Sequence, residues 1–193
     1  MPSVGSGLRR LGSREVTFAT LGALLLFLVA AVVSYCSLAG RSAGGGGFLG
    51  APLGSADTPL FVAIAARNAF AALGLFSGVV TFGVGSVVGV IFQGCIVGAS
   101  TAAASTEVGL PSAVGSVIGY AIFELPALVL AASAGLVPLA TVLLAPVEAA
   151  GLSASVRYLR SLRPSLALLS ISLVLIVIGA SVETILITSR SAP

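Results

Sequence analysis

The sequence carries very little charge, and this shortage decides the class of protein. Only 8% of its 193 residues are charged, whereas soluble domains carry about 25%. Hydrophobic residues make up 58% of the chain, and its mean hydropathy is +1.18. The apolar runs are continuous rather than alternating, which favours spanning helices over a membrane β-barrel. We therefore predict an all-α, polytopic transmembrane helical bundle without a separate soluble domain.

Several residue types and motifs needed for common enzyme chemistry are also absent. There is no histidine, which excludes a His-ligated metal site and any His-based catalytic triad. The sequence has no paired-Asp motif and no Walker motif. We expect neither enzymatic activity nor a cofactor nor a metal site. Cys36 and Cys95 lie in separate apolar runs, and we expect small buried hydrophobes there rather than a disulfide or metal pair.

The chain divides into a short tail, one membrane domain and a second tail. We assign residues 1–15 to a cytoplasmic tail, 16–188 to a single transmembrane domain, and 189–193 to a tail. The uncharged stretch 16–38 predicts a retained first helix. A cleaved signal peptide is the alternative, because Ser37-Leu38-Ala39 resembles a cleavage site. The apolar stretch, however, exceeds the roughly 7–15 residues of a signal peptide.

The remaining apolar stretches predict four further spans. Residues 59–104 are too long for one crossing of about 20 residues, and glycines near residue 83 mark the break. The stretch 139–150 is short and contains Pro146, so we expect it to be re-entrant or interfacial. Residues 152–163 predict an amphipathic surface helix, and Pro164 is expected to start the last span. The five predicted spans are 16–38, 59–80, 84–104, 114–136 and 165–188.

Arginine positions predict the orientation in the membrane. All nine basic residues are arginine, and two groups of them lie at 9–14 and 157–163. The positive-inside rule places both groups in the cytoplasm, so an even number of spans must separate them. Five spans satisfy this rule in a multi-pass protein of the cell (plasma) membrane with a cytoplasmic amino terminus. If 139–150 crosses fully, there are six spans, and the second basic group lies outside.

A small set of polar residues lies within the predicted spans. A charge at the bilayer centre costs about 2.5–3.5 kcal/mol on insertion scales, so Glu124 needs compensation. Arg67 is the only cation inside a span and is the expected counter-ion for Glu124 or Glu183. The set holds the helices together through hydrogen bonds, or it forms a functional site; both interpretations stay open. Its members are Arg67, Asn68, Gln93, Tyr120, Glu124 and Glu183.

Glycines at a spacing of four residues predict close helix packing. Gly85 and Gly89 form one such pair in the stretch 84–104, and Gly94 and Gly98 form another. This spacing places small residues on one helix face, where two backbones can approach closely. The alternative is that the pairs only reflect the richness of the chain in glycine, which has 24 such residues.

An ordered set of motifs over residues 60–188 resembles the stage II sporulation protein M family of prokaryotic membrane proteins. The clearest is Gly119-Tyr120-Ala121-Ile122-Phe123-Glu124-Leu125-Pro126, where the family reads Pro-His-Gly-x-x-Glu-x-Pro. Others are Arg67-Asn68-Ala69-Phe70, Gln93-Gly94-x-x-x-Gly98 and Ala180-Ser181-Val182-Glu183. Four positions depart from the family pattern: Arg67, Gly119, Tyr120 and Ala121. The lost histidine speaks against any His-dependent chemistry.

The resemblance implies a membrane scaffold. The namesake member works with peptidoglycan-degrading proteins, although the family also occurs in organisms that do not sporulate. We expect a non-enzymatic scaffold or subunit whose partners are the lipid bilayer and other membrane or envelope proteins, including copies of itself, and no nucleic acid. The alternatives are a transporter or channel component that uses the Arg/Glu site and, less favoured, an intramembrane hydrolase.

Overall fold

The computed structural model describes residues 4–39, 59–144 and 151–191 of the chain. Within these residues the fold consists of helices, and five of them are long and apolar enough to cross a membrane. This confirms the predicted helical bundle and favours five spans over six. A short 3-10 helix, η1 (Ser77–Val79), follows the second of them. The five are α1 (Val4–Leu38), α2 (Leu60–Phe76), α3 (Val84–Val108), α4 (Leu110–Leu143) and α5 (Ala154–Ser191).

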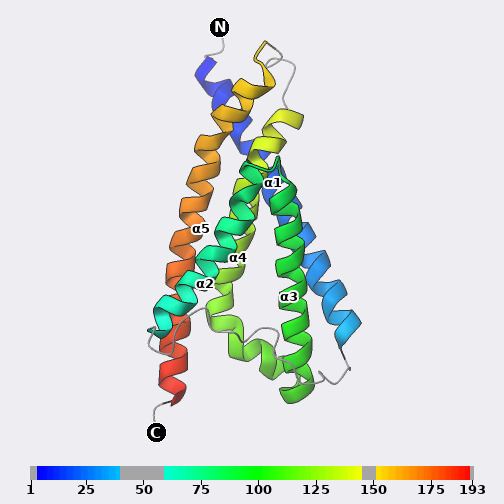
Figure 1. The fold of residues 1–193 in the computed structure, drawn as a ribbon, viewed down its shortest axis with the longest axis vertical. Helices are drawn as coiled ribbons and strands as arrows, with labels where there is room; N and C mark the ends of the chain where they lie inside the picture. Colours follow the sequence, from blue (N-terminus) through cyan, green and yellow to red (C-terminus); the bar gives the residue numbers. More distant parts are fainter. Residues whose placement is uncertain (1–3, 40–58, 145–150, 192–193) are drawn as a thin grey trace.

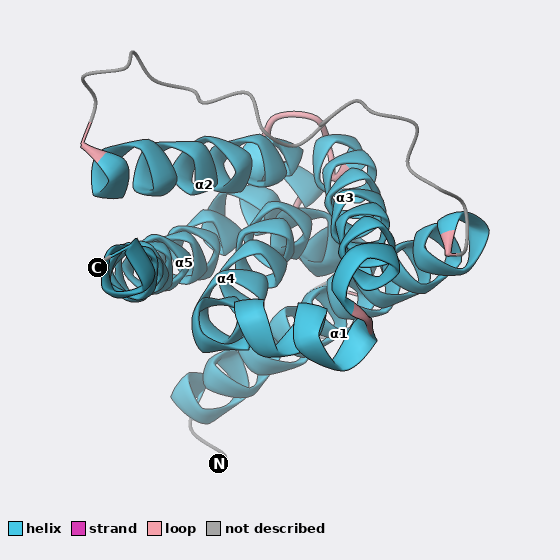
Figure 2. Cartoon of the chain, turned by 90° about the horizontal axis from the view of Figure 1, so that it is seen from below, coloured by secondary structure: helices cyan, strands magenta, loops and turns pink. Residues whose placement is uncertain are grey.

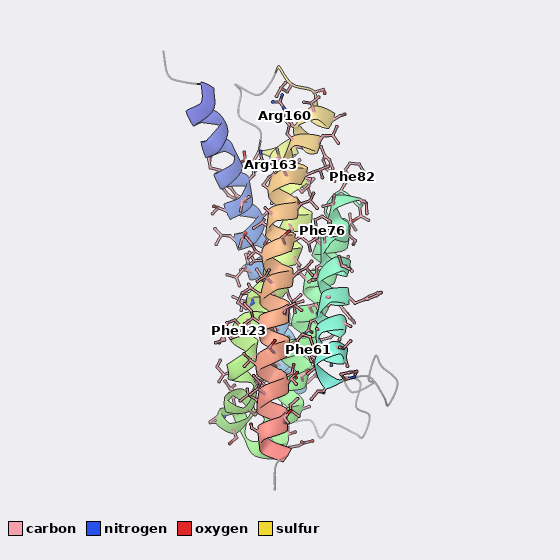
Figure 3. All side chains as sticks on the ribbon, turned by 90° about the vertical axis from the view of Figure 1, so that its left-hand side faces the viewer. Phe61, Phe76, Phe82, Phe123, Arg160 and Arg163 are labelled. Atoms are coloured by element: carbon pink, nitrogen blue, oxygen red, sulfur yellow. The ribbon has the colours of Figure 1, made fainter. Side chains whose placement is uncertain are left out.

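The helices run alternately up and down the bundle, so its two ends differ (Figure 1). We call the end where α1 and α5 begin the N-side; the α2–α3 turn and the end of α4 also lie there. The opposite end, where α1 and α5 finish, is the C-side. Figure 3 places Arg160 and Arg163 at the N-side, near the first turns of α1. The two arginine groups therefore belong to helix segments at one end of the bundle, as the orientation argument requires.

The first helix starts earlier than the sequence predicted. Helix α1 begins at Val4 rather than at residue 16, so most of the expected tail is helical. Helix formation is cooperative, and the apolar stretch that forms the span lets the helix continue upstream through good helix formers such as leucine and arginine. The end of α1 at Leu38 agrees with the predicted span.

A tight turn separates α2 from α3 at the predicted break. Phe82 and Gly83 both have positive φ angles, of 50° and 88°. Glycine adopts this left-handed conformation without a steric penalty, and Gly83 caps the amino terminus of α3. The Tyr158 hydroxyl of α5 donates a hydrogen bond to the carbonyl of Val79 in this turn. The Tyr158 ring also contacts the Phe82 ring, with 5.6 Å between the ring centroids, so α5 holds the turn.

Two internal prolines, Pro138 and Pro164, do not mark helix ends as the predicted spans implied. Helix α4 continues through Pro126 and Pro138 to Leu143, so residues 139–143 belong to it and do not start a re-entrant segment. Residues 145–150 of that predicted segment lie outside the described residues. Helix α5 likewise runs through Pro164, so the predicted surface helix and last span form one helix. A proline removes one backbone hydrogen bond, and neighbouring hydroxyls can replace it.

The clearest replacement is at Pro138. Proline has no N–H, so the carbonyl of Ala134, four residues earlier, lacks its helical donor. The buried Ser165 hydroxyl of α5 donates a hydrogen bond to this carbonyl. Two helical turns further along the same interface, the Ser172 hydroxyl donates a hydrogen bond of 2.7 Å to the Ala127 carbonyl. Both bonds join α4 to α5, and the bond from Ser165 lets α4 remain helical past Pro138.

Helix α4 is the centre of the bundle, since it packs against each of the other four helices (Figure 2). Its second half is almost fully buried, and its buried residues include Ala127, Ala131, Ala134 and Val137. Its first half runs obliquely across the C-side before the helix turns alongside α5 (Figure 1). Apolar side chains of this first half are exposed: Val114, Val117, Ile118 and Ile122. The hydrophobic core therefore lies mainly towards the N-side.

The two cysteines lie outside this core. Both Cys36 on α1 and Cys95 on α3 are free thiols with exposed side chains, rather than the buried hydrophobes that we expected. Exposed apolar surface is ordinary on a helix that faces lipid, because lipid tails are as apolar as the side chains that contact them.

Candidate functional site

The polar residues expected inside the membrane meet where α2, α4 and α5 pack together. The Asn68 side-chain amide of α2 donates a hydrogen bond of 2.6 Å to Oε1 of Glu124 on α4. Both side chains are half-buried. Residues 56 positions apart in the sequence thus form a direct bond between two helices. This bond gives Glu124 one of the partners that a carboxyl group needs at membrane depth.

A second acidic side chain reaches the same place from α5. The carboxyl groups of Glu124 and Glu183 lie within hydrogen-bonding range of each other. An ionised carboxylate only accepts hydrogen bonds, so a bond between two carboxyls requires a proton on one of them. Glu183 lies eight residues before the end of α5 at Ser191, which is about 12 Å at 1.5 Å per residue. The carboxyl pair therefore lies within the C-side half of the membrane segment.

Arg67 supplies positive charge to both acids. It precedes Asn68 on α2, and its side chain is exposed. Its charge attracts both Glu124 and Glu183, so it is not the counter-ion of one carboxyl alone. We call Arg67, Asn68, Glu124 and Glu183 the polar cluster. With one proton on the carboxyl pair, its formal charges sum to zero.

A glycine that the sequence argument missed makes room for Glu124. Gly179 is buried on α5, one turn before Glu183. A methyl group at Gly179 would lie 2.7 Å from Cγ of Glu124, closer than side chains tolerate. The Glu124 side chain therefore lies directly across the α5 backbone at this glycine. The sequence signal was the small pair Gly179-Ala180 one turn before an intramembrane acid.

One predicted member, Gln93, is placed differently. Gln93 is half-buried on α3 and is not among the groups that hydrogen-bond to, or interact electrostatically with, the two carboxyls. The adjacent Gly94 faces α1. Tyr120 is half-buried on α4, one turn before Glu124. The site is therefore built from α2, α4 and α5, with no described polar contribution from α1 or α3.

The glycine pairs of α3 pack against two different neighbours. A methyl group at Gly94 would lie 2.5 Å from the Phe27 carbonyl oxygen of α1, and one at Gly98 would lie 2.9 Å from Cβ of Ser34. Gly89 instead faces α2, where a methyl group would lie 3.0 Å from a methyl carbon of Leu75. Gly85 faces the α2–α3 turn, with the Thr81 hydroxyl 2.8 Å from an added methyl group. Close backbone approach thus occurs along much of α3.

A second close contact, also missed from the sequence, joins three helices near the N-side. The buried Ser86 hydroxyl of α3 donates a 2.5 Å hydrogen bond to the Leu75 carbonyl of α2. Gly135 of α4 lies against the same spot, since a methyl group there would lie 2.7 Å from that carbonyl oxygen. Gly78 completes the contact, because a methyl group there would lie 2.9 Å from the Gly135 carbonyl oxygen. We call Leu75, Gly78, Ser86 and Gly135 the glycine–serine contact.

The polar cluster can form hydrogen bonds and bind protons. Among the described residues, no group of three or more His, Cys, Asp or Glu side chains could hold a metal ion. Two carboxyls, one amide and one guanidinium can bind a proton or a small polar group.

The comparisons with known proteins agree with this architecture. The family model described as Stage II sporulation protein M matches residues 15–187. The match extends the resemblance seen over residues 60–188 to include the spanning part of α1. Neither the curated proteins nor the solved structures that were compared contain a match. A family model that covers almost the whole chain shows membership: the chain belongs to the stage II sporulation protein M family.

Proposed function

We propose that this multi-pass membrane protein is a non-enzymatic scaffold or subunit of a membrane or envelope complex. The observation that carries the proposal is that five span-length helices contain nearly all of the described residues. These residues thus form no separate extramembrane domain in which soluble chemistry could take place. Family membership supports the same role.

The outer surface of the bundle supports binding to lipid and to other membrane helices. Large apolar side chains are exposed along α1 and α5, among them Phe18, Leu25, Ile171 and Val174. In a bilayer, helices associate through packing and hydrogen bonds, since lipid tails are as apolar as leucine. The partners that we propose are the bilayer, other membrane or envelope proteins, and a second copy of this chain.

Co-purification from native membranes tests the scaffold proposal. The tagged protein is extracted in mild detergent, and a tagged, unrelated five-span protein from the same membranes is the control. We expect specific partners that are enriched with the protein and absent from the control. Two differently tagged copies, expressed together, test self-association in the same experiment. A protein that repeatedly purifies alone and as a monomer would contradict the proposal.

The orientation belongs to the same proposal. We place the N-side in the cytoplasm, because Arg14, Arg160 and Arg163 are exposed there and positive charge favours the cytoplasmic face. In a background without Cys36 and Cys95, single cysteines replace Arg14 and Ser189. A membrane-impermeant thiol reagent applied to intact cells is expected to label position 189 and spare position 14. The reverse pattern would overturn the orientation.

A second candidate function, a transporter or channel component, is favoured by one observation. The polar cluster places an arginine, an amide and two carboxyls at membrane depth, and ionisable residues there mark ion or proton pathways. Flux measurements on the purified protein in vesicles, with Glu124→Gln as the variant, test it. Flux that Glu124→Gln leaves unchanged, for every ion and solute tried, would eliminate this function.

A further inference from the structure

The contact between Glu124 and Glu183 is special because it bridges two helices and needs a proton. The two carboxyl groups are within hydrogen-bonding range, and two ionised carboxylates at such a separation repel one another. We propose that one proton shared between Glu124 and Glu183 holds α4 against α5 in the C-side half of the bundle, and that this contact opens when the proton leaves. The inference concerns a conformational switch and goes beyond the scaffold function.

The surroundings of the pair favour the singly protonated state. On α2, Arg67 attracts both carboxyls and Asn68 donates a hydrogen bond to Glu124. On α4 and α5, the titratable neighbours are the two glutamates and Tyr120. Among the described residues, α1 and α3 supply no charge that acts on the pair: Arg14 and Glu15 lie at the N-side, and Glu107 lies near the end of α3. One proton makes the cluster neutral, whereas its loss leaves a net negative charge in the membrane.

The backbone geometry places Glu124 against α5 next to Glu183. Gly179 lets the Glu124 side chain cross α5, because any larger residue would meet Cγ of Glu124. Glu183 follows one helical turn later on the same face of α5. Glu124 therefore lies against α5 beside Glu183, and repulsion between the two carboxylates would act on the helices that carry them.

Beyond the pair, α4 is more exposed, and Gly119 there packs against Leu186 of α5, 3.0 Å from an added methyl group. Towards the C-side, Val114, Val117 and Ile118 are exposed, while the residues after Glu124 enter the buried core. The serine-to-carbonyl bonds from Ser165 and Ser172 hold α4 to α5 only on the core side of the pair. Opening would thus move the first turns of α4 and leave the N-side half in place.

Infrared spectroscopy tests whether the shared proton exists. The full chain is reconstituted in nanodiscs of uncharged lipid and titrated from pH about 5 to about 9, a range that surrounds neutral pH. We expect a protonated-carboxyl C=O band that is lost as the pH rises, and that is absent from Glu183→Gln, whose amide can donate to Glu124 without a proton. Glu107→Gln, an exposed acid, is the matched control and should keep the band. If the unmodified protein shows no such band at any pH, the proposal is overturned, and no variant is needed for that conclusion.

A distance measurement tests the movement. Spin labels replace the exposed residues Ile118 on α4 and Ile185 on α5, in a background where Cys36 and Cys95 are alanine. We expect the distance between labels to increase as the pH rises, and to stay short in Glu183→Gln. A distance that does not change with pH, or that changes equally in Glu183→Gln, would overturn the switch. Neither readout uses a partner, so failure of the scaffold proposal would not affect the result.

Discussion

The two halves of the contact between α4 and α5 are built from different chemistry. Towards the N-side, Ser165 and Ser172 donate hydrogen bonds to the carbonyls of Ala134 and Ala127. Towards the C-side, the contact consists of Glu124 and Glu183, with help from α2. A hydroxyl donor keeps its proton over the whole physiological range, whereas a carboxyl pair does not. The first half therefore does not depend on pH, and the second is the half that the proposed shared proton would regulate.

Packing follows the same division. The second half of α4 is buried by the other helices, and the glycine–serine contact brings three backbones together there. The first half of α4 exposes apolar side chains and contributes few buried residues. A close-packed region transmits any added volume to its neighbours, while an open region accommodates it. Substitutions at matched positions in the two halves should therefore have unequal effects.

The largest expected effect is from Gly135→Leu in the glycine–serine contact. The new side chain would meet the Leu75 carbonyl, which belongs to the backbone and cannot move aside. We expect a loss of unfolding free energy of at least about 3 kcal/mol, at the upper end for overpacking. Denaturant unfolding in detergent micelles measures it. Gly115→Leu is the control on the same helix, because nothing lies within 4 Å of a methyl group there. Equal losses in the two variants would refute the division.

Gly179→Ala ranks second, since it tests whether α5 holds Glu124 in place. The methyl group displaces Cγ of Glu124, and we expect a loss of about 1–3 kcal/mol in unfolding free energy. The Asn68–Glu124 hydrogen bond should also lengthen or break, which amide resonances of Asn68 would report. Gly74→Ala on α2 serves as the comparison, because a methyl group there meets nothing within 4 Å. A Gly179→Ala protein as stable as Gly74→Ala would contradict the geometry.

Ser165→Ala is expected to have the next largest effect. It leaves the Ala134 carbonyl, already without a helical donor because of Pro138, without any partner in the core. An unsatisfied buried acceptor costs about 1–3 kcal/mol, and the loss should be the same at acidic and alkaline pH. Ser170→Ala removes an exposed hydroxyl that bonds within its own helix, and we expect it to change stability little. A pH-dependent loss in Ser165→Ala would show that the N-side half also depends on a titrating group.

The smallest expected effect is from Tyr158→Phe at the α2–α3 turn. The variant keeps the ring contact with Phe82 and loses only the hydrogen bond to the Val79 carbonyl. One hydrogen bond contributes about 1 kcal/mol, which thermal unfolding in nanodiscs can resolve. Tyr158→Leu removes the ring contact as well and should be less stable than Tyr158→Phe. If the two variants are equally stable, the ring contact with Phe82 contributes nothing.

How far the sequence predicted the site depended on the kind of residue. Glu124, Glu183 and Arg67 stood out because a charge in an apolar run requires a partner, and Asn68 adjoined one of them. Gly179 and Gly135 did not stand out in a glycine-rich chain, because a glycine matters through what lies opposite it. Gln93 was grouped with the cluster on depth alone, but the structure places it on α3. Depth follows from sequence, whereas direction around a helix follows from packing.

The sequence by itself determined the class of protein and the need to compensate Glu124, and it favoured five spans over six. These features follow from the hydrocarbon core, which sets span length and penalises unpaired charge. Only the tertiary structure decided that Pro138 and Pro164 remain inside helices, because their tolerance depends on donors and packing from neighbours. It also decided that Glu124 meets Asn68 and Glu183 across Gly179. Those contacts join three helices, and no local pattern in the sequence encodes which helix faces meet.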